Sequence, residues 1–234
     1  MKVGLQKLKR RDVFKPLITM NVWFCLVVFS GGTSIIAFQV DILNDYPSPT
    51  HSSNTSRLGV KEEDLIGYNS AIISAVLSLV GSILSSILVN YLGIKKLFNM
   101  SSIGMAIGMV GLAVTLRHVG KEHDAMELWR ATHTASVWLI DFFFGLGVST
   151  IPTSVIGEMF PYDAKGFAGL ISITHCGVGG VVIKMHLYAY DMCGYYLYFM
   201  YAFMNLLDVL FVEMFVPETV GKTQEEIGEY FKEK

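Results

Sequence analysis

The sequence has little charge and little cysteine, and it lacks the short motifs that mark catalytic sites. Only 16% of its 234 residues are charged, whereas soluble domains carry roughly a quarter, and 52% are hydrophobic. A water-soluble fold is therefore not expected. The 18 lysines and arginines nearly balance the 20 aspartates and glutamates, so the net charge of -2 offers no basic field to nucleic acid. We expect no nucleic-acid partner.

The few cysteines lie far apart, at Cys25, Cys176 and Cys193, each within an apolar run. No CxxC pair and no His-rich cluster accompanies them, which argues against a disulfide framework and against a zinc site. The motifs GxxxxGK, HExxH and GxSxG are also absent from the sequence. The sequence therefore predicts a protein that is not an enzyme and that carries no cofactor or metal.

What the sequence does contain is long apolar runs. About 20 apolar residues cross the roughly 30 Å of hydrocarbon in a bilayer. Six runs of this length have no charge or a single one: 16–40, 65–94, 97–116, 131–157, 166–190 and 192–212. Lipid-exposed backbone must satisfy its own hydrogen bonds, and barrel strands would alternate polar with apolar residues. We therefore predict an all-α protein of the lipid bilayer, with a six-helix domain at 16–216 between a cytosolic basic segment at 1–15 and a cytosolic tail at 217–234.

Lysine and arginine in the flanking segments set the predicted orientation. Six precede the first run and six more fall on the same side by alternation, against five on the opposite side. Both termini are therefore predicted to be cytosolic, in a protein of the plasma membrane. The segment 41–64 would then be extracellular, and its sequon at Asn54 is a candidate for glycosylation, although such triplets also arise by chance.

Three local patterns resemble signatures of sugar porters in the major facilitator superfamily. The run GEMFP at 157–161, with Lys165 and Gly166 after it, is similar to the E-I/L-F-P…R-G pattern that closes the tenth helix in that family. The run PETVGKTQEEI at 217–227 is similar to the signature that follows the twelfth helix, and GIKK at 93–96 is similar to the turn between the eighth and ninth helices. Since the six runs follow the same order and spacing, the chain resembles the carboxyl half of a sugar porter, helices seven to twelve.

This resemblance implies a function and a partner. It implies half of a major facilitator fold that moves a small polar solute by alternating access, together with an amino-terminal six-helix half in the same chain or in another. The residues around 147–158 and the run IKM at 183–185 are most similar to insect-type facilitated trehalose transporters, so trehalose or a hexose is the implied solute. The chain itself would then be partial or truncated.

The resemblance also implies which residues face the solute. In this architecture the first and fourth runs line the passage, which gives the candidates Ser30, Gly31, Thr33, Ser34, Gln39, Thr150, Pro152 and Thr153. Serine and threonine also join helices within lipid, and this is the alternative for each of them. Family positions that carry glutamines are Val27 and Val28 here, and the tryptophan position is Thr153. Because a sugar site needs several converging polar groups, hexose binding of the usual kind is not expected.

Charged residues and histidines inside the bilayer need a reason, because burial of charge is costly. Asp141 and Lys184 lie at comparable depths, so an ion pair across neighbouring helices is one hypothesis. The alternative is that Lys184 extends to the headgroups while Asp141 is hydrated. His175 is either satisfied by a backbone carbonyl or part of a proton relay that couples transport to pH.

Charges at the cytosolic rim form a further candidate group. The resemblance implies that Lys95 or Lys96 meets Glu158, that Glu218 adds a second carboxylate, and that Lys165 replaces an arginine of the family. Ordinary positive-inside charges explain the two neighbouring lysines equally well.

A second function class remains open at the level of sequence. A membrane scaffold derived from a sugar porter would keep the helices and lose transport, and the missing glutamines and tryptophan favour it. A water or solute channel is disfavoured, since no Asn-Pro-Ala loop interrupts the runs.

Overall fold

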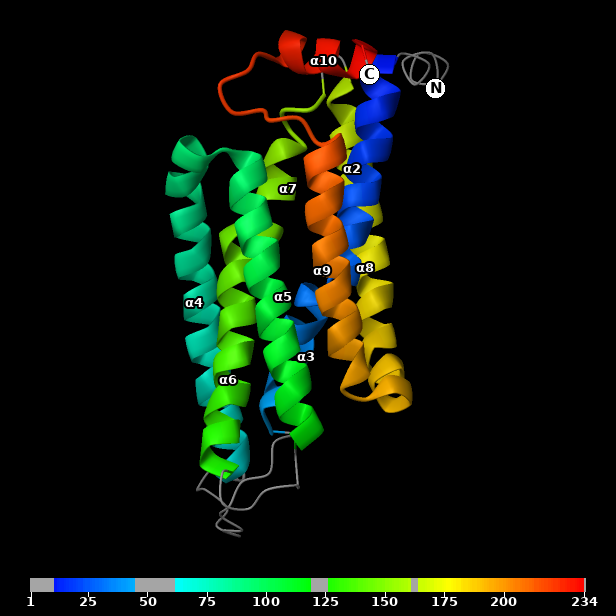
Figure 1. Ribbon diagram of the computed structural model, residues 1–234. Coiled ribbons are helices and arrows are strands. Elements are labelled where there is room, and N and C mark those ends of the chain that lie inside the picture. The colour runs from blue at the N-terminus through cyan, green and yellow to red at the C-terminus, as the bar shows by residue number, and fades with distance from the viewer. Residues whose placement is uncertain (1–10, 45–61, 119–125, 161–163, 234) are drawn as a thin grey trace.

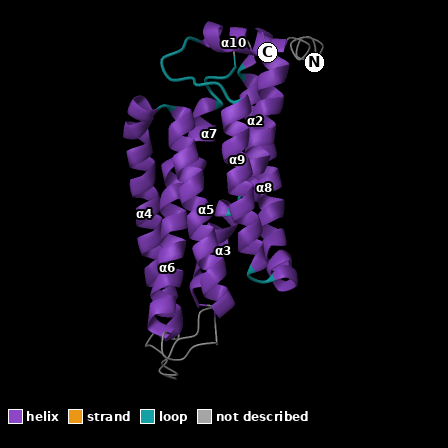
Figure 2. Ribbon diagram, in the orientation of Figure 1, coloured by secondary structure: helices purple, strands orange, loops and turns teal. Residues whose placement is uncertain are grey.

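The computed structural model describes residues 11–44, 62–118, 126–160 and 164–233, and these ranges form helices joined by turns (Figures 1 and 2). The helices are α2 (Arg11–Phe29), α3 (Gly32–Asn44), α4 (Glu62–Leu92), α5 (Ile94–His118), α6 (Met126–Phe143), the π-helix η1 (Phe144–Val148), α7 (Thr150–Val155), α8 (Gly166–Cys193), α9 (Tyr196–Phe215) and α10 (Gln224–Glu233). Asn54 lies outside the described residues, so its glycosylation stays a prediction.

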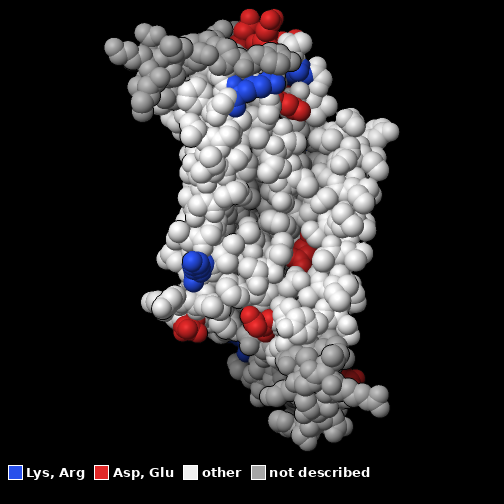
Figure 3. Space-filling view, turned by 180° about the vertical axis from the view of Figure 1, so that it is seen from behind, with Lys and Arg blue, Asp and Glu red and all other residues white. Residues whose placement is uncertain are grey.

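Six stretches are long and apolar enough to cross a membrane: Val13–Asn44, Gly67–Leu92, Ile94–His118, Glu127–Val155, Gly166–Cys193 and Tyr196–Phe215. They coincide with the six predicted runs and confirm the predicted fold class. Figure 3 shows a broad uncharged band across one face, with most charged side chains of that face towards the two ends. This is the distribution expected of a molecule that lies in a bilayer.

The helices form two groups that meet along α5 and α9. On one side α4, α5 and α6 pack together, and on the other α2 packs against α8 and α9 (Figure 1). Helix α3 lies between the groups and contacts α4, α6 and α8. The buried share of the most apolar stretch is 61% in α5 but only 17% in α4 and 17% in α8. Helix α5 is therefore the centre of the bundle, while α4 and α8 present most of their surface outward.

Small residues allow α5 and α6 to approach closely. A Cβ added at Gly108 would lie 2.7 Å from Ile140 and 3.2 Å from the carbonyl oxygen of Ser136, and one at Gly104 would overlap the ring of Phe143. Only glycine leaves room for this contact, as the GxxxG spacing of the two residues indicates.

The first predicted run is two helices rather than one. Helix α2 ends at Phe29 and α3 begins at Gly32, and Gly31 between them has a φ of +84°. A search for uncharged runs does not detect this break, because both halves are apolar. Glycine enters the left-handed region without the steric cost that other residues meet.

The fourth run also departs from a regular helix. In η1 the amide of Ser149 donates to the carbonyl of Phe144 at 3.0 Å, which is an i to i+5 hydrogen bond. Pro152 follows within α7 and has no N–H to donate to an earlier turn. A π-turn inserts one residue without breaking the span, and such turns occur often at functional positions.

The predicted tail contains a helix that covers one end of the bundle. Helix α10 packs against the start of α2 and buries Ile227 and Phe231 (Figure 1). Thr223 and Glu226 form a capping box, in which the amide of Thr223 donates to Glu226 at 2.8 Å and the amide of Glu226 donates to Thr223 at 3.3 Å. The start of α2 and the helix α10 therefore lie at the same end of the bundle.

Candidate functional site

The structure divides the predicted solute-facing residues into buried and accessible sets. Ser30, Gly31, Ser34 and Pro152 are buried. The hydroxyl of Ser30 donates to the carbonyl of Val27 at 2.6 Å, so this side chain serves its own helix. These residues shape the breaks in the two spans rather than an open surface.

Thr33, Gln39, Thr150 and Thr153 keep accessible surface. The Gln39 amide donates to the carbonyl of Ala71 on α4 at 3.2 Å. The Thr150 hydroxyl lies 3.1 Å from that of Ser85, also on α4, and the Thr153 hydroxyl donates to the carbonyl of Thr150 at 2.8 Å. A hydroxyl that donates to a carbonyl can still accept a hydrogen bond, so these side chains retain the capacity to bind a solute hydroxyl.

One pocket opens between α2 and α8 and contains His175. It is lined by Asn21, Phe24, Cys25, Val28, Thr174, His175 and Val178. The imidazole of His175 packs on the ring of Phe24, with 4.6 Å between ring centroids, and among the described residues no hydrogen-bond partner faces its buried Nδ1. The Asn21 amide donates to the carbonyl of Leu17 at 2.8 Å, within its own helix. The pocket thus combines an imidazole ring with nearby aromatic and polar side chains.

Sequence reasoning singled out His175 and missed its neighbours Asn21, Cys25 and Thr174. A signal was present, because Asn21 and Cys25 are four residues apart and share one face of a helix. What the sequence does not contain is the information that this face of α2 lies against α8.

The predicted ion pair between Asp141 and Lys184 is not formed. Asp141 on α6 is 1% exposed and accepts a hydrogen bond from the hydroxyl of Ser74 on α4, while its Oδ1 has no partner in the part of the chain that the structure describes. Lys184 lies exposed on α8. The physical reason is the packing, since α6 lies against α4 and α5 whereas α8 lies against α2 and α9. Two helices of similar depth are not neighbours merely because they are adjacent in the sequence.

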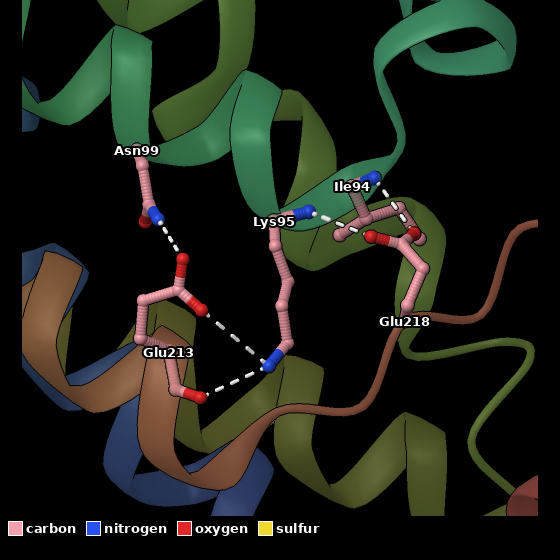
Figure 4. Close-up of polar contacts among 5 residues, drawn as sticks. All are labelled: Ile94, Lys95, Asn99, Glu213 and Glu218. Carbon is pink, nitrogen blue, oxygen red and sulfur yellow. Dashed lines mark hydrogen bonds and ion pairs between the residues drawn. The ribbon is translucent and has the colours of Figure 1, made fainter.

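The residues predicted to lie at the cytosolic rim contact one another, but with different partners from those implied by the resemblance (Figure 4). Glu218 accepts hydrogen bonds from the backbone amides of Ile94 at 2.8 Å and Lys95 at 3.3 Å. These amides are unsatisfied within the helix because they lie in its first turn. Gly93, with a φ of +79°, makes the turn that exposes them. The Glu218 carboxylate therefore caps α5 by accepting from backbone amides of that helix, and not by pairing with a lysine side chain.

Lys95 pairs with Glu213 at the end of α9, and the predicted contact with Glu158 is not formed. Its Nζ lies 3.7 Å from Glu213 Oε2 and donates to the Glu213 carbonyl at 2.9 Å (Figure 4). Glu158 instead accepts from the hydroxyl of Thr219 at 2.6 Å. Lys96 is exposed, and Lys165 is exposed just before α8.

Glu213 at the end of α9 and Asn99 on α5 were missed because the family signatures include neither position. Thr219 lies within the run 217–227, but the sequence does not indicate its contact with Glu158. The Asn99 amide donates to Glu213 at 3.0 Å, one turn after the contact that Glu213 makes with Lys95 (Figure 4). Since α5 and α9 pack against each other, the ammonium group of Lys95 pairs with the carboxylate on the last turn of α9.

Comparison with known families gives a match over almost the whole chain. The family described as "Sugar (and other) transporter" matches residues 2–231. Sugar transporter ERD6-like 7 of Arabidopsis thaliana is 30% identical over 231 residues, which are 95% of this chain and 46% of that protein. Sugar transporter ERD6-like 6 of the same plant is 27% identical over 96% of this chain and 44% of its own length. The chain thus spans less than half the length of these relatives.

Animal and bacterial proteins are also similar. The solute carrier family 2, facilitated glucose transporter member 2 of Gallus gallus is 28% identical over 63% of this chain and 27% of its own. Among solved structures, the major facilitator superfamily proton:xylose symporter XylE bound to 6-bromo-6-deoxy-D-glucose has a TM-score of 0.65 and 20% identity, over 91% of this chain and 42% of that one. At this identity the likeness shows the fold, and it confirms a major facilitator type of helix arrangement.

Proposed function

Because the chain belongs to the sugar (and other) transporter family, we propose that it forms one wall of a carrier that moves a sugar across the membrane. The observation that carries this proposal is the family match over residues 2–231, a range that includes all six candidate spans. Carriers of this architecture hold their solute between two halves that rock against each other. The family is one of transporters, in agreement with the prediction that the chain is not an enzyme.

We propose that this chain forms the carboxyl half of the carrier. The run 217–227, which resembles the signature after the twelfth helix, follows the sixth span, and the chain spans less than half of its relatives. Helices α4 and α8 are only 17% buried in their apolar stretches, which leaves them broad faces for an amino-terminal six-helix half. Helix α10 and the start of α2 lie at the same end of the bundle, which agrees with termini on one side of the membrane. The excess of lysine and arginine in the flanking segments makes the cytosolic side the one that we propose, in a protein of the plasma membrane.

The proposed solute surface is the pocket between α2 and α8 together with the accessible polar side chains of the first and fourth spans. His175, Thr33, Gln39 and Thr153 provide groups that can bind sugar hydroxyls. Phe24 is buried and packs on His175, so it holds the imidazole in the wall of the pocket. The glutamines and the tryptophan that the family carries are replaced in this chain, so the solute need not be a hexose. The local likeness to trehalose carriers makes trehalose the first solute to test.

Uptake of radiolabelled trehalose and glucose tests this proposal. Oocytes would express the chain with and without an amino-terminal half, and surface protein would be measured in parallel. We expect saturable uptake of one sugar only when both halves are present. The variant His175→Ala should lower uptake several-fold, whereas the control Ser172→Ala on the same helix, whose hydroxyl serves its own helix, should not. Absence of uptake in surface-expressed protein would refute the carrier function.

The same assay addresses coupling to pH, for which His175 and Asp141 are the proposed groups. Within the described ranges, Nδ1 of His175 and Oδ1 of Asp141 are buried polar atoms without a hydrogen-bond partner, which makes them the groups to test first. Imidazole titrates between about pH 5 and 8, so a coupled carrier should change its uptake rate across that range. A flat rate would exclude coupling through His175.

A second function is favoured by a specific observation. Val27 and Val28 are 3% and 2% exposed and pack where the family carries glutamines. A scaffold that binds a partner and no longer transports would keep such an apolar interior. Surface expression without uptake of any tested sugar is the result that this alternative predicts.

A further inference from the structure

Asp208 of α9 is a fully buried carboxyl group without a partner. It lies seven residues before Phe215, where the last candidate span ends, and thus about 10 Å inside that end at 1.5 Å per residue. Both of its oxygen atoms are buried, and no group in the described ranges donates a hydrogen bond to either of them. Because a charge inside a span is costly unless a partner compensates it, Asp208 needs either such a partner or a state without charge.

The carboxyl group lies at the junction of α2, α5 and α9, which pack on one another (Figure 1). Asn205 is three residues earlier on α9 and therefore on the same face, and it is fully buried. Its amide donates to the Ser30 carbonyl of α2 at 3.1 Å, and the Ser102 hydroxyl of α5 donates to its carbonyl at 2.9 Å. Val212, one turn after Asp208, is also fully buried. The three helices thus exclude solvent from this junction.

Neither α2 nor α5 supplies a charge to compensate Asp208. The charged residues of α2 lie in its first five positions, between Arg11 and Lys15, and those of α5 lie in its first and last turns. Within the first turn of α5, Lys95 is the nearer of the two lysines to α9, and its Nζ pairs with Glu213 at 3.7 Å. This ion pair already occupies the ammonium group that is closest to Asp208 along α5.

Helix α8, the third helix that packs on α9, supplies no such charge either. His186 lies 3.0 Å from the hydroxyl of Tyr201, and His175 lines the pocket with Cys25 of α2. Lys184 is exposed. A metal ion is not indicated as the compensating group, since the described residues contain no group of three or more His, Cys, Asp or Glu side chains that could hold one. The ligand that remains for a carboxyl group in this position is a proton.

We propose that Asp208 is a proton-binding site that holds the junction of α2, α5 and α9 together. With the proton bound, the carboxyl group is uncharged, and the three helices can pack around it. When the junction opens, water reaches the group and takes up the proton, and the carboxylate that remains is hydrated. A carboxylate cannot be enclosed again without a compensating charge, so the junction closes only after the proton has returned. The site shares no residue with the pocket around His175 and does not depend on a solute.

Infrared spectroscopy of the full chain in lipid vesicles at pH 7 tests this site without any sugar. A protonated carboxyl group has a C=O stretching band that is separate from the bands of a carboxylate. We expect Asp208→Asn, which keeps the shape of the uncharged group, to lose one such band relative to the unsubstituted chain. The matched control Asp191→Asn, at an exposed position near the end of α8, should lose none. If folded Asp208→Asn loses no band, Asp208 is ionised and the proposal is wrong.

A second variant leaves Asp208 intact, in case Asp208→Asn does not fold. Asp141 and Asp208 are the buried aspartates among the described residues. In Asp141→Asn, with all aspartates carrying ¹³C in the side-chain carboxyl group, the band of Asp208 should still appear and should be shifted by the isotope. Absence of an isotope-shifted carboxyl band from this variant would overturn the proton site. Circular dichroism of each variant reports whether the helices are formed.

Discussion

At the scale of single residues, several polar side chains within the spans donate to the backbone of another helix. Gln39 donates to Ala71, Trp138 donates to Ser70, and Asn205 donates to Ser30. The hydrocarbon region of a bilayer holds no water to hydrogen-bond with a backbone carbonyl that lacks a partner in its own helix, and such side-chain contacts satisfy that carbonyl instead. They fasten the helix ends and breaks to the rest of the bundle.

His133 gives the clearest case for a stability measurement. It is fully buried, its Nε2 donates to the Ile42 carbonyl at 2.8 Å, and its Nδ1 faces the hydroxyl of Thr115 at 3.2 Å. We expect His133→Ala to lower the free energy of unfolding by about 2 to 4 kcal/mol, through an unsatisfied carbonyl and a cavity. Reversible unfolding in mixed micelles measures this.

The matched control for His133 is its neighbour Thr132, which is exposed and donates to the Leu128 carbonyl of its own helix at 2.8 Å. Thr132→Ala should change the free energy of unfolding by less than about 0.5 kcal/mol. Equal effects of the two substitutions would mean that the link between α6 and α3 adds nothing to stability.

At the scale of elements, two of the six spans are interrupted, the first at Ser30 and Gly31 and the fourth at η1. The existence and approximate extent of all six spans could be predicted from apolar runs with at most one charge, because hydrocarbon thickness sets their length. Neither interruption could be predicted in this way. The break depends on Tyr201 and Asn205, which are distant in sequence, and no local pattern reports that they lie against it.

Two glycine substitutions test the account of the break. Gly31→Ala places a Cβ at a φ of +84° and against the Tyr201 ring, so it should lower the free energy of unfolding by about 2 kcal/mol or more. Gly180→Ala, in the middle of α8 with no atom within 4 Å of the added Cβ, should be neutral or stabilise by up to about 1 kcal/mol. Thermal unfolding of both variants gives the comparison. If Gly31→Ala unfolds at the same temperature as the unsubstituted protein, the backbone at the break accepts a side chain without strain, and this account of the break is wrong.

At the scale of the whole molecule, the bundle is organised by α5 rather than by chain order. The resemblance to a carboxyl half could be read from the runs at 157–161 and 217–227, because these signatures lie at helix ends where charges are constrained. The side-chain partners within the bundle could not be read from the sequence. Lys95 meets Glu213, and Asp141 meets Ser74, because α5 packs on α9 and α6 packs on α4. Such adjacency is a property of the packed fold.

The central claim is that solute passes along the face where α2 meets α8, and the native thiol of Cys25 in that pocket allows a direct test. The chain joined to an amino-terminal half, with Cys176 replaced by serine, would be labelled with a small maleimide, with Cys193 at the end of α8 as the internal control. A saturating concentration of the transported sugar should slow the labelling of Cys25 several-fold and leave the labelling of Cys193 unchanged. Labelling of Cys25 at the same rate with and without that sugar would contradict the account.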